Sequence, residues 1–154
     1  MASIKIGLLG AGKISSRHIN RIANRDDAEI VAVCDVSEDK IEQFKSQPGA
    51  GEASVFADAQ SMYASRLLDA VIICTPHSMH FEQAMSALEA GLHVFLEKPM
   101  VTNSNDAKEL AGKARESKKI MTVGYNTSAT PAFGHLREII DQESLGKLEL
   151  VNGY

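Results

Sequence analysis

The sequence lacks tryptophan, has few aromatic residues and carries no excess of basic ones. Aromatic residues make up 5% of the 154-residue chain, and the formal net charge is −4. Proteins that bind single-stranded nucleic acid stack bases on aromatic rings, and proteins that bind duplexes or anionic membranes need a basic surface. We therefore expect neither nucleic acid nor a membrane surface as a partner.

Cysteine is also scarce, and long apolar runs are absent. The two cysteines, Cys34 and Cys74, form no C-x-x-C pair or other zinc spacing, so we expect free buried thiols in a reducing compartment. No apolar run approaches the roughly 20 residues of a membrane span. The first three residues lead into an apolar segment without the features of a signal peptide. A soluble, cytoplasmic protein is expected.

The most informative stretch that is present is the glycine turn at residues 10–15, Gly-Ala-Gly-Lys-Ile-Ser. It follows the apolar run 6–9 and precedes a helical pattern, which is the context of a dinucleotide-binding fingerprint. The first glycine permits a tight turn, the second lets the backbone approach a pyrophosphate, and the helix N-terminus attracts phosphate. Ser15 stands where Gly or Ala is usual, and an ordinary glycine turn is the alternative. We expect four residues of the turn to bind the cofactor: Gly10, Gly12, Lys13 and Ile14.

A carboxylate follows the next apolar strand, which spans residues 29–34. Asp35 comes 20 residues after Ser15, where the acidic residue of the fingerprint meets the adenosine ribose hydroxyls. A solvated aspartate at a strand end is the alternative. With both parts of the fingerprint present, we expect Asp35 to bind the cofactor ribose.

Strands and helices alternate along the chain. The apolar segments read as strands, and Ser37, Asp58 and either Thr102 or Asn103 read as N-caps of the helices between them. This alternation predicts an α/β fold, a Rossmann-type doubly wound parallel sheet with right-handed crossovers. The expected strands are residues 6–9, 29–34, 55–56, 67–74, 93–96 and 120–124.

The last part of the sequence has a different pattern. Thr130-Pro131 starts a helix that we expect to end at Leu145-Gly146, and an alternating strand follows from Lys147 to Tyr154. A strand with one polar face belongs to an antiparallel sheet, whose other strands are not in this sequence. We expect a dinucleotide-binding domain at residues 1–126. Residues 127–154 would then be the crossover helix and first strand of a second α+β domain, truncated here.

Several polar groups follow strands of the expected sheet and therefore reach its carboxyl edge, where doubly wound folds bind ligands. They lie at Thr75-Pro76, Glu97-Lys98-Pro99 and Tyr125-Asn126. A lysine beside a nicotinamide could donate a hydrogen bond to a substrate oxygen and stabilise its developing charge. A surface lysine after a strand is the alternative for Lys98 alone.

Taken in order, these segments resemble the N-terminal domain of the glucose–fructose oxidoreductase, inositol dehydrogenase and rhizopine-catabolism family (Gfo/Idh/MocA). The resemblance covers nearly the whole chain. It rests on the glycine turn, Asp35, Thr75-Pro76 with His80, Ala90-Gly91-Leu92-His93-Val94, and Glu97-Lys98-Pro99. It implies an NAD(P)-dependent oxidoreductase of sugars, cyclitols or related polyols that is a homo-oligomer at full length.

The resemblance also assigns roles to residues. It implies that Lys98 lies by the reacting carbon as the catalytic residue and that Asp35 favours NAD(H) over NADP(H), since Val36-Ser37 offers no arginine and Lys40 is a weak substitute. An arginine common in the family after Asn126 is missing from residues 127–131. The family's Asp and His beside the lysine belong to the second domain, so the 154 residues alone are not expected to turn over a substrate. The cofactor contacts implied at the later strand ends are Cys74, Thr75, Pro76, His80, Glu97, Lys98 and Asn126.

The remaining histidines have weaker signals. His77 and His80 are spaced i, i+3, but no carboxylate or thiol cluster completes a metal site, and we expect no metal. His18 and His135 are expected on helix surfaces.

Three functions remain open from the sequence. The first is the cofactor part of an NAD-dependent sugar or polyol dehydrogenase. The second is a non-catalytic NAD(H)-binding module, against which the presence of Lys98 argues, because phosphate and ribose binding do not need it. The third is an enzyme with a redox-neutral cycle, such as the NAD-dependent glycosidases of the same family.

Overall fold

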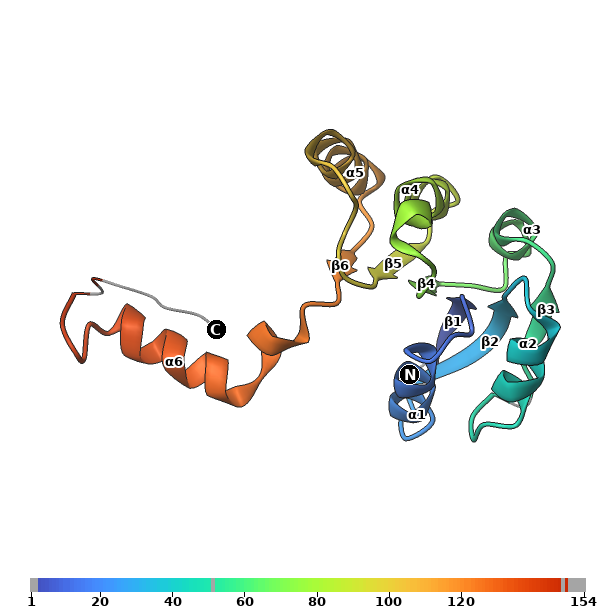
Figure 1. Cartoon of the computed structure of the whole chain (residues 1–154), viewed down its shortest axis with the longest axis horizontal. Helices are drawn as coiled ribbons and strands as arrows, with labels where there is room; N and C mark the ends of the chain where they lie inside the picture. Colours follow the sequence, from blue (N-terminus) through green and yellow to red (C-terminus); the bar gives the residue numbers. More distant parts are fainter. Residues whose placement is uncertain (1–2, 51, 148, 150–154) are drawn as a thin grey trace. The chain divides into compact units, whose positions relative to one another are not determined.

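Six strands form one parallel sheet, in the order β3-β2-β1-β4-β5-β6. The computed structural model describes residues 3–50, 52–147 and 149, and the chain divides into a first unit, Met1–Gly124, and a second unit, Tyr125–Tyr154. The sheet belongs to the first unit and confirms the expected Rossmann-type fold (Figure 1). Its strands are β1 (Ile4–Leu9), β2 (Ala28–Cys34), β3 (Ser54–Phe56), β4 (Ala70–Ile73), β5 (His93–Leu96) and β6 (Met121–Val123).

Helices cover both faces of the sheet. Helices α1 and α2 lie on one face, and α3, α4 and α5 lie on the other (Figure 1). The chain runs from β1 to one side through β2 and β3, then crosses to the other side of β1 to form β4. This reversal leaves a crevice at the carboxyl ends of β1 and β4, where ligands bind in such folds. The helices are α1 (Ser15–Ile22), α2 (Glu38–Lys45), α3 (Ala59–Ala64), α4 (His80–Glu89) and α5 (Ser104–Ser117), with a 3₁₀ turn, η1 (His77–Met79), before α4.

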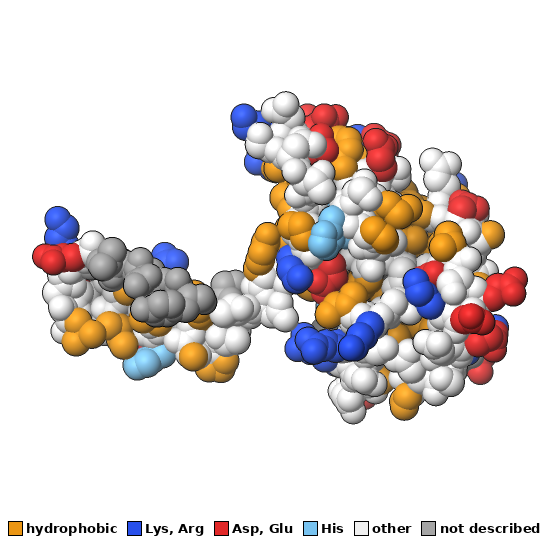
Figure 2. Space-filling view, in the orientation of Figure 1, with side chains coloured by type: hydrophobic (Ala, Val, Ile, Leu, Met, Phe, Trp, Pro, Cys, Tyr) orange, Lys and Arg blue, Asp and Glu red, His pale blue; other side chains and the backbone are white. Residues whose placement is uncertain are grey.

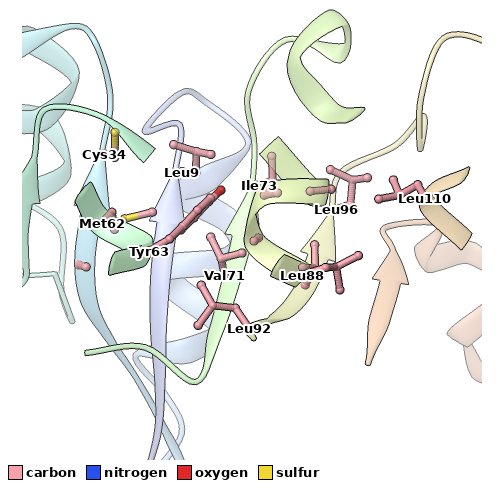
Figure 3. Packing of buried hydrophobic residues seen from close by; sticks show 14 residues of the cluster. Leu9, Cys34, Met62, Tyr63, Val71, Ile73, Leu88, Leu92, Leu96 and Leu110 are labelled. Atoms are coloured by element: carbon pink, nitrogen blue, oxygen red, sulfur yellow. The ribbon is translucent and has the colours of Figure 1, made fainter. Parts of the chain in front are cut away.

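Alternate residues of each central strand point to opposite faces of the sheet and pack in two separate hydrophobic cores. Leu8 packs with Ile19 and Phe44 beneath α1 and α2, whereas the next residue, Leu9, packs in the cluster beneath α3, α4 and α5. Figure 3 shows the second cluster, in which Leu9, Ile73 and other side chains from neighbouring strands meet. A sheet buried on both faces needs apolar residues at successive positions, which is why β1, β2 and β4 read as continuous apolar runs.

Two of the helix starts in the first unit show the expected side-chain capping, whereas Ser37 stands at the N-cap position of α2 without a capping hydrogen bond from its side chain. The Asp58 side chain accepts a hydrogen bond from the Ser61 N–H, and the Asn103 side chain accepts from two N–H groups of α5. Gly91 has a φ of +77° just after α4, as expected for a residue that closes a helix in the left-handed region. These caps fix where α3, α4 and α5 begin or end.

The fourth strand is shorter than predicted. The apolar run suggested residues 67–74, but β4 spans Ala70–Ile73. Leu67 is exposed, and Asp69 turns the chain by accepting the Lys5 N–H while its own N–H donates to the Lys5 carbonyl. The run therefore includes a connection whose apolar residues do not pair in the sheet.

The second unit contains a 3₁₀ turn, η2 (Asn126–Ala129), and helix α6 (Pro131–Asp141). Thr130 caps α6 as predicted, but the helix ends at Asp141 and not at Leu145-Gly146. Glu143 adopts a left-handed φ of 50°, and the next N–H donates to the Ile139 carbonyl, which closes the helix without a glycine. The strand predicted from Lys147 to Tyr154 falls almost wholly outside the described residues.

Candidate functional site

The glycine turn between β1 and α1 has two glycines with different spatial requirements. Gly10 has a φ of +90°, and a Cβ there would lie 2.9 Å from the carbonyl carbon and oxygen of Cys74. A Cβ on Gly12 would meet nothing within 4 Å. Gly10 is therefore needed for the turn itself, whereas Gly12 leaves open space over the backbone, as the approach of a phosphate group requires.

Ser15 replaces the small third residue of the fingerprint without leaving a polar group unsatisfied. It begins α1 and is fully buried, and its hydroxyl donates a hydrogen bond to the Gly12 carbonyl. A buried hydroxyl that finds an acceptor avoids most of the cost of its desolvation. Serine thus fits this position because the turn supplies its partner.

Asp35 ties the end of β2 to the glycine turn. One carboxylate oxygen, Oδ2, accepts the Ala11 N–H at 2.8 Å, and the other, Oδ1, accepts the Ser37 N–H at 2.9 Å. The Lys40 ammonium lies 3.8 Å from Oδ2, and the Asp35 side chain is only 6% exposed. The negative charge is consequently held in one place at the crevice by two backbone amides.

A cavity of about 410 Å³ opens beside this aspartate, within the range of small-molecule sites. It brings together residues from the ends of β1, β2 and β4, as expected for the carboxyl edge of a parallel sheet. Six of the predicted cofactor residues line it: Gly10, Gly12, Asp35, Cys74, Thr75 and Pro76.

Other residues of the cavity were not predicted. Lys40 comes from α2, and Met79 and Gln83 come from η1 and α4; the Thr75 hydroxyl donates to the Gln83 side-chain oxygen. Asp58 follows β3 and could have been found by the same strand-end argument that identified Asp35. The helix residues carry no such signal, since their position depends on how each helix crosses the sheet.

Lys98 follows β5 and is exposed. Among the described residues, no carboxylate forms an ion pair with its ammonium group. Lys98 does not line the cavity. The same is true of four further predicted residues: Lys13, Ile14, His80 and Glu97. The structure therefore divides the predicted cofactor residues into those that line the cavity and those that lie outside its lining.

His18 contradicts the prediction of a helix-surface residue. Its Nε2 lies 2.8 Å from Oε1 of Glu97, and the two side chains are 12% and 13% exposed. The His18 ring also meets the edge of Phe95, with 5.1 Å between ring centroids. Glu97 is 79 residues further along the chain, so no local pattern could have indicated this pair.

His80 is fully buried and holds two loops together. Its Nδ1 lies 2.9 Å from the Pro99 carbonyl oxygen, and its Nε2 lies 3.0 Å from the Thr75 carbonyl oxygen. In this arrangement neither ring nitrogen faces the cavity. His80 thus links the loop after β4, which lines the cavity, to the loop that carries Lys98.

Asn126 begins η2 in the second unit. Its predicted cofactor contact stays a prediction.

The two thiols are poor nucleophiles. Burial raises the pKa of Cys34 to about 11 and that of Cys74 to about 12, and neither thiol is in a disulfide. Only a thiolate attacks or binds metal efficiently. Within the described part of the chain, no three His, Cys, Asp or Glu residues gather as a metal site.

Acidic and basic side chains are interspersed on the face of the first unit seen in Figure 2. No helix in the described ranges is both long and apolar enough to pass through a lipid bilayer.

Comparisons with known proteins agree with this geometry. The family model described as "Oxidoreductase family, NAD-binding Rossmann fold" matches residues 4–125. D-glucoside 3-dehydrogenase of Escherichia coli (strain K12) is 31% identical over 94% of the chain, and scyllo-inositol 2-dehydrogenase (NADP(+)) of Bacillus subtilis (strain 168) is 30% identical over 88%. The chain spans 41% and 40% of the length of these two proteins.

A solved structure is similar over the same range. It is the crystal structure of scyllo-inositol dehydrogenase from Lactobacillus casei with bound NAD(H) and scyllo-inositol, at a TM-score of 0.85 and 27% identity. The match covers 94% of this chain and 42% of that one.

Proposed function

Since the chain belongs to the oxidoreductase family with an NAD-binding Rossmann fold, we propose that it is the cofactor-binding part of an NAD-dependent dehydrogenase. The substrate would be a sugar, a cyclitol or a related polyol, the kind of compound on which the relatives act by name. Catalysis by the whole protein and its substrate are part of this proposal.

The observation that carries the proposal is the joint geometry of the turn and Asp35. Gly12 leaves open space over the backbone, and Asp35 fixes its carboxylate beside it through the Ala11 N–H. A dinucleotide needs both features, since its pyrophosphate approaches backbone at a helix N-terminus and its ribose meets a carboxylate. The residues present fit NAD(H).

The chain's own residues would act in two places. At the turn, Gly10, Gly12, Lys13, Ile14 and the first N–H groups of α1 would hold the phosphates. Beyond them, Cys74, Thr75 and Pro76 would form the wall of the cavity. When bound, a nicotinamide supplies the hydride acceptor or donor. Lys98 would donate a hydrogen bond to the reacting substrate oxygen and stabilise negative charge on it.

A preference for NAD(H) over NADP(H) is part of the proposal. Asp35 and Asp58 both line the cavity, and a 2′-phosphate would add negative charge near them. Among the described residues that line this cavity, Lys40 is the one cationic side chain, and its ammonium already lies 3.8 Å from Asp35 Oδ2. Family membership alone does not settle the preference, because the Bacillus subtilis relative uses NADP(+) by name.

The remaining features of the proposal follow the sequence. Residues 1–126 would bind the dinucleotide, with Asn126 and Glu97 near the nicotinamide and His80 holding the loops, and residues 127–154 would belong to a second domain. We propose that the full-length protein is a homo-oligomer. We also propose a cytoplasmic location, and the free thiols support this location because thiols stay reduced there. Neither nucleic acid nor a membrane would be a partner.

The test is a titration of the 154-residue chain with NADH and NADPH by nucleotide fluorescence. We expect NADH to bind at least about tenfold more tightly, a difference of about 1.4 kcal/mol. Asp35→Ala should narrow the gap by weakening NADH. If neither nucleotide binds and neither raises the melting temperature, the proposed function is wrong. With a substrate identified, steady consumption of NAD⁺ would separate a dehydrogenase from a redox-neutral enzyme.

A further inference from the structure

Two adjacent residues at the end of β5, Glu97 and Lys98, carry opposite charges. The carboxylate of Glu97 nevertheless has partners other than the Lys98 ammonium. Its Oε1 lies 2.8 Å from Nε2 of His18, and its Oε2 accepts the backbone N–H of Lys98 at 3.2 Å. Among the described residues, the Lys98 ammonium forms no ion pair, and the ion-pair partner of Glu97 is His18.

The surroundings of the Glu97 carboxylate are built for this arrangement. The His18 and Glu97 side chains are nearly buried, and the Phe95 ring supports His18 from the side. A Cβ on Gly124 would lie 3.2 Å from the Phe95 ring and 3.5 Å from the Glu97 carboxyl carbon. The glycine at the end of β6 therefore leaves room for the Phe95 ring, and its Cα lies next to the Glu97 carboxyl group.

The proposed role of Lys98 explains why the Glu97 carboxylate should be kept away from the Lys98 ammonium. A nearby carboxylate would compete with the substrate oxygen for the N–H donors of the lysine. It would also favour the charged ammonium over the neutral amine. A lysine meant to bind a reacting oxygen works best when its donors are unoccupied.

We infer that His18 is a positioning residue that draws the Glu97 carboxylate away from the Lys98 ammonium and fixes the Lys98 backbone. This inference deepens the proposed function, on which the role of Lys98 rests. His18 lies on α1, whose first residues follow the glycine turn, so one helix serves both the phosphates and the lysine.

The experiment measures the acetylation rate of Lys98 in the 154-residue chain. Limited acetic anhydride is added, and mass spectrometry compares Lys98 with Lys118, an exposed lysine that serves as the internal reference. Only the neutral amine is acetylated, so a carboxylate that pairs with the ammonium slows the reaction. The ratio of the two rates cancels differences in reagent and in global stability.

Four variants give distinct expectations. Glu97→Gln in the otherwise unchanged chain should leave the ratio as it is, because the carboxylate is already sequestered. His18→Leu should lower the ratio by about threefold, the size expected of one exposed ion pair. His18→Leu with Glu97→Gln should restore it, and His18→Gln, whose amide nitrogen can occupy the position of Nε2, should resemble the wild type.

The inference is overturned if Glu97→Gln alone accelerates Lys98 acetylation, or if His18→Leu leaves the ratio unchanged. The first result needs no substitution at His18, so the inference remains testable if His18→Leu does not fold. An NADH titration of the same wild-type sample separates the two failures. Absence of NADH binding overturns the proposed function, whereas the acetylation ratios alone decide the role of His18.

Discussion

The carboxylate of Asp35 and the backbone N–H of Ala11 are joined by a hydrogen bond of 2.8 Å. This bond fastens the end of β2 to the middle of the glycine turn, and the second carboxylate oxygen holds the Ser37 N–H. Asp35 therefore has a structural role in addition to its proposed contact with the cofactor ribose.

Replacing Asp35 should cost stability even without a cofactor. Asp35→Ala leaves two N–H groups without their charged acceptor, and we expect a loss of about 1–3 kcal/mol in the free energy of unfolding. Urea denaturation of the cofactor-free chain measures it. Asp26→Ala is the control, since this exposed aspartate should change stability by less than about 0.5 kcal/mol. Equal stability of the two variants would limit Asp35 to ligand binding.

The two glycines of the turn should separate folding from binding. Gly10→Ala places a Cβ against the Cys74 carbonyl at a positive φ, and it should lose at least about 1–2 kcal/mol of stability from backbone strain alone. Gly12→Ala meets no atom within 4 Å, so it should fold normally. Its methyl group would occupy the approach of the pyrophosphate, and NADH affinity should fall by about tenfold or more.

Denaturation and NADH titration of both glycine variants provide the test. A Gly12→Ala chain that binds NADH as the wild type does would contradict the placement of the pyrophosphate at this turn.

The buried histidine of α4 should be sensitive to loss of its polar atoms. His80→Phe keeps an aromatic ring but removes both ring nitrogens, which lie within hydrogen-bond distance of the Pro99 and Thr75 carbonyl oxygens, and we expect a loss of about 1–3 kcal/mol in the free energy of unfolding. His77→Phe, at an exposed position in η1, is the matched control and should be nearly neutral. Amide exchange should also quicken in the loop of Lys98 in His80→Phe. Unchanged exchange there would show that His80 does not hold that loop.

Alkaline pH should weaken the fold through the two thiols. Burial raises the pKa of Cys34 from 9.0 to about 11 and that of Cys74 to about 12. The folded protein then keeps protons that the unfolded chain has already released. Their contribution to stability is fully present below pH 9 and is lost as the pH rises toward the folded values.

Melting temperatures at about pH 8 and about pH 10.5 measure this loss. The double variant Cys34→Ala, Cys74→Ala is the control, because it lacks both groups and should lose less stability over the same interval. A parallel decline in the two proteins would mean that other groups cause it.

The fold was predictable from the sequence because the signals for strands and helix caps are local and recur along the chain. Continuous apolar runs such as Ile72–Ile73 follow from burial on both faces, and caps such as Asp58 follow from the chemistry of one helical turn. The ends of elements were harder where the sequence is permissive. Leu67 and Leu68 are apolar yet precede β4, and α6 closes at Glu143, a residue type that rarely adopts a positive φ.

The candidate site was predictable only in part, for a geometric reason. Parallel strands all end at one edge, so residues such as Gly10, Asp35 and Thr75 could be brought together from sequence spacing. Helix residues such as Gln83 reach the cavity through the packing of α4 on the sheet. The pair of His18 and Glu97 joins α1 to the loop after β5, and a contact so distant in the chain leaves no trace in local pattern.

The central place of β1 in the sheet has a consequence for the order of folding. Its residues Ile6–Leu9 pair with Ala70–Ile73, which are made 64 residues later. Contacts between distant segments form slowly, because a long stretch of chain must be closed before they stabilise anything. During synthesis β1 can pair with β2 first and leaves its other edge open until β4 emerges. The crevice that Gly10 shares with Thr75 is thus assembled late, and a delay between the two halves prolongs the exposure of an apolar strand edge that can pair with another chain.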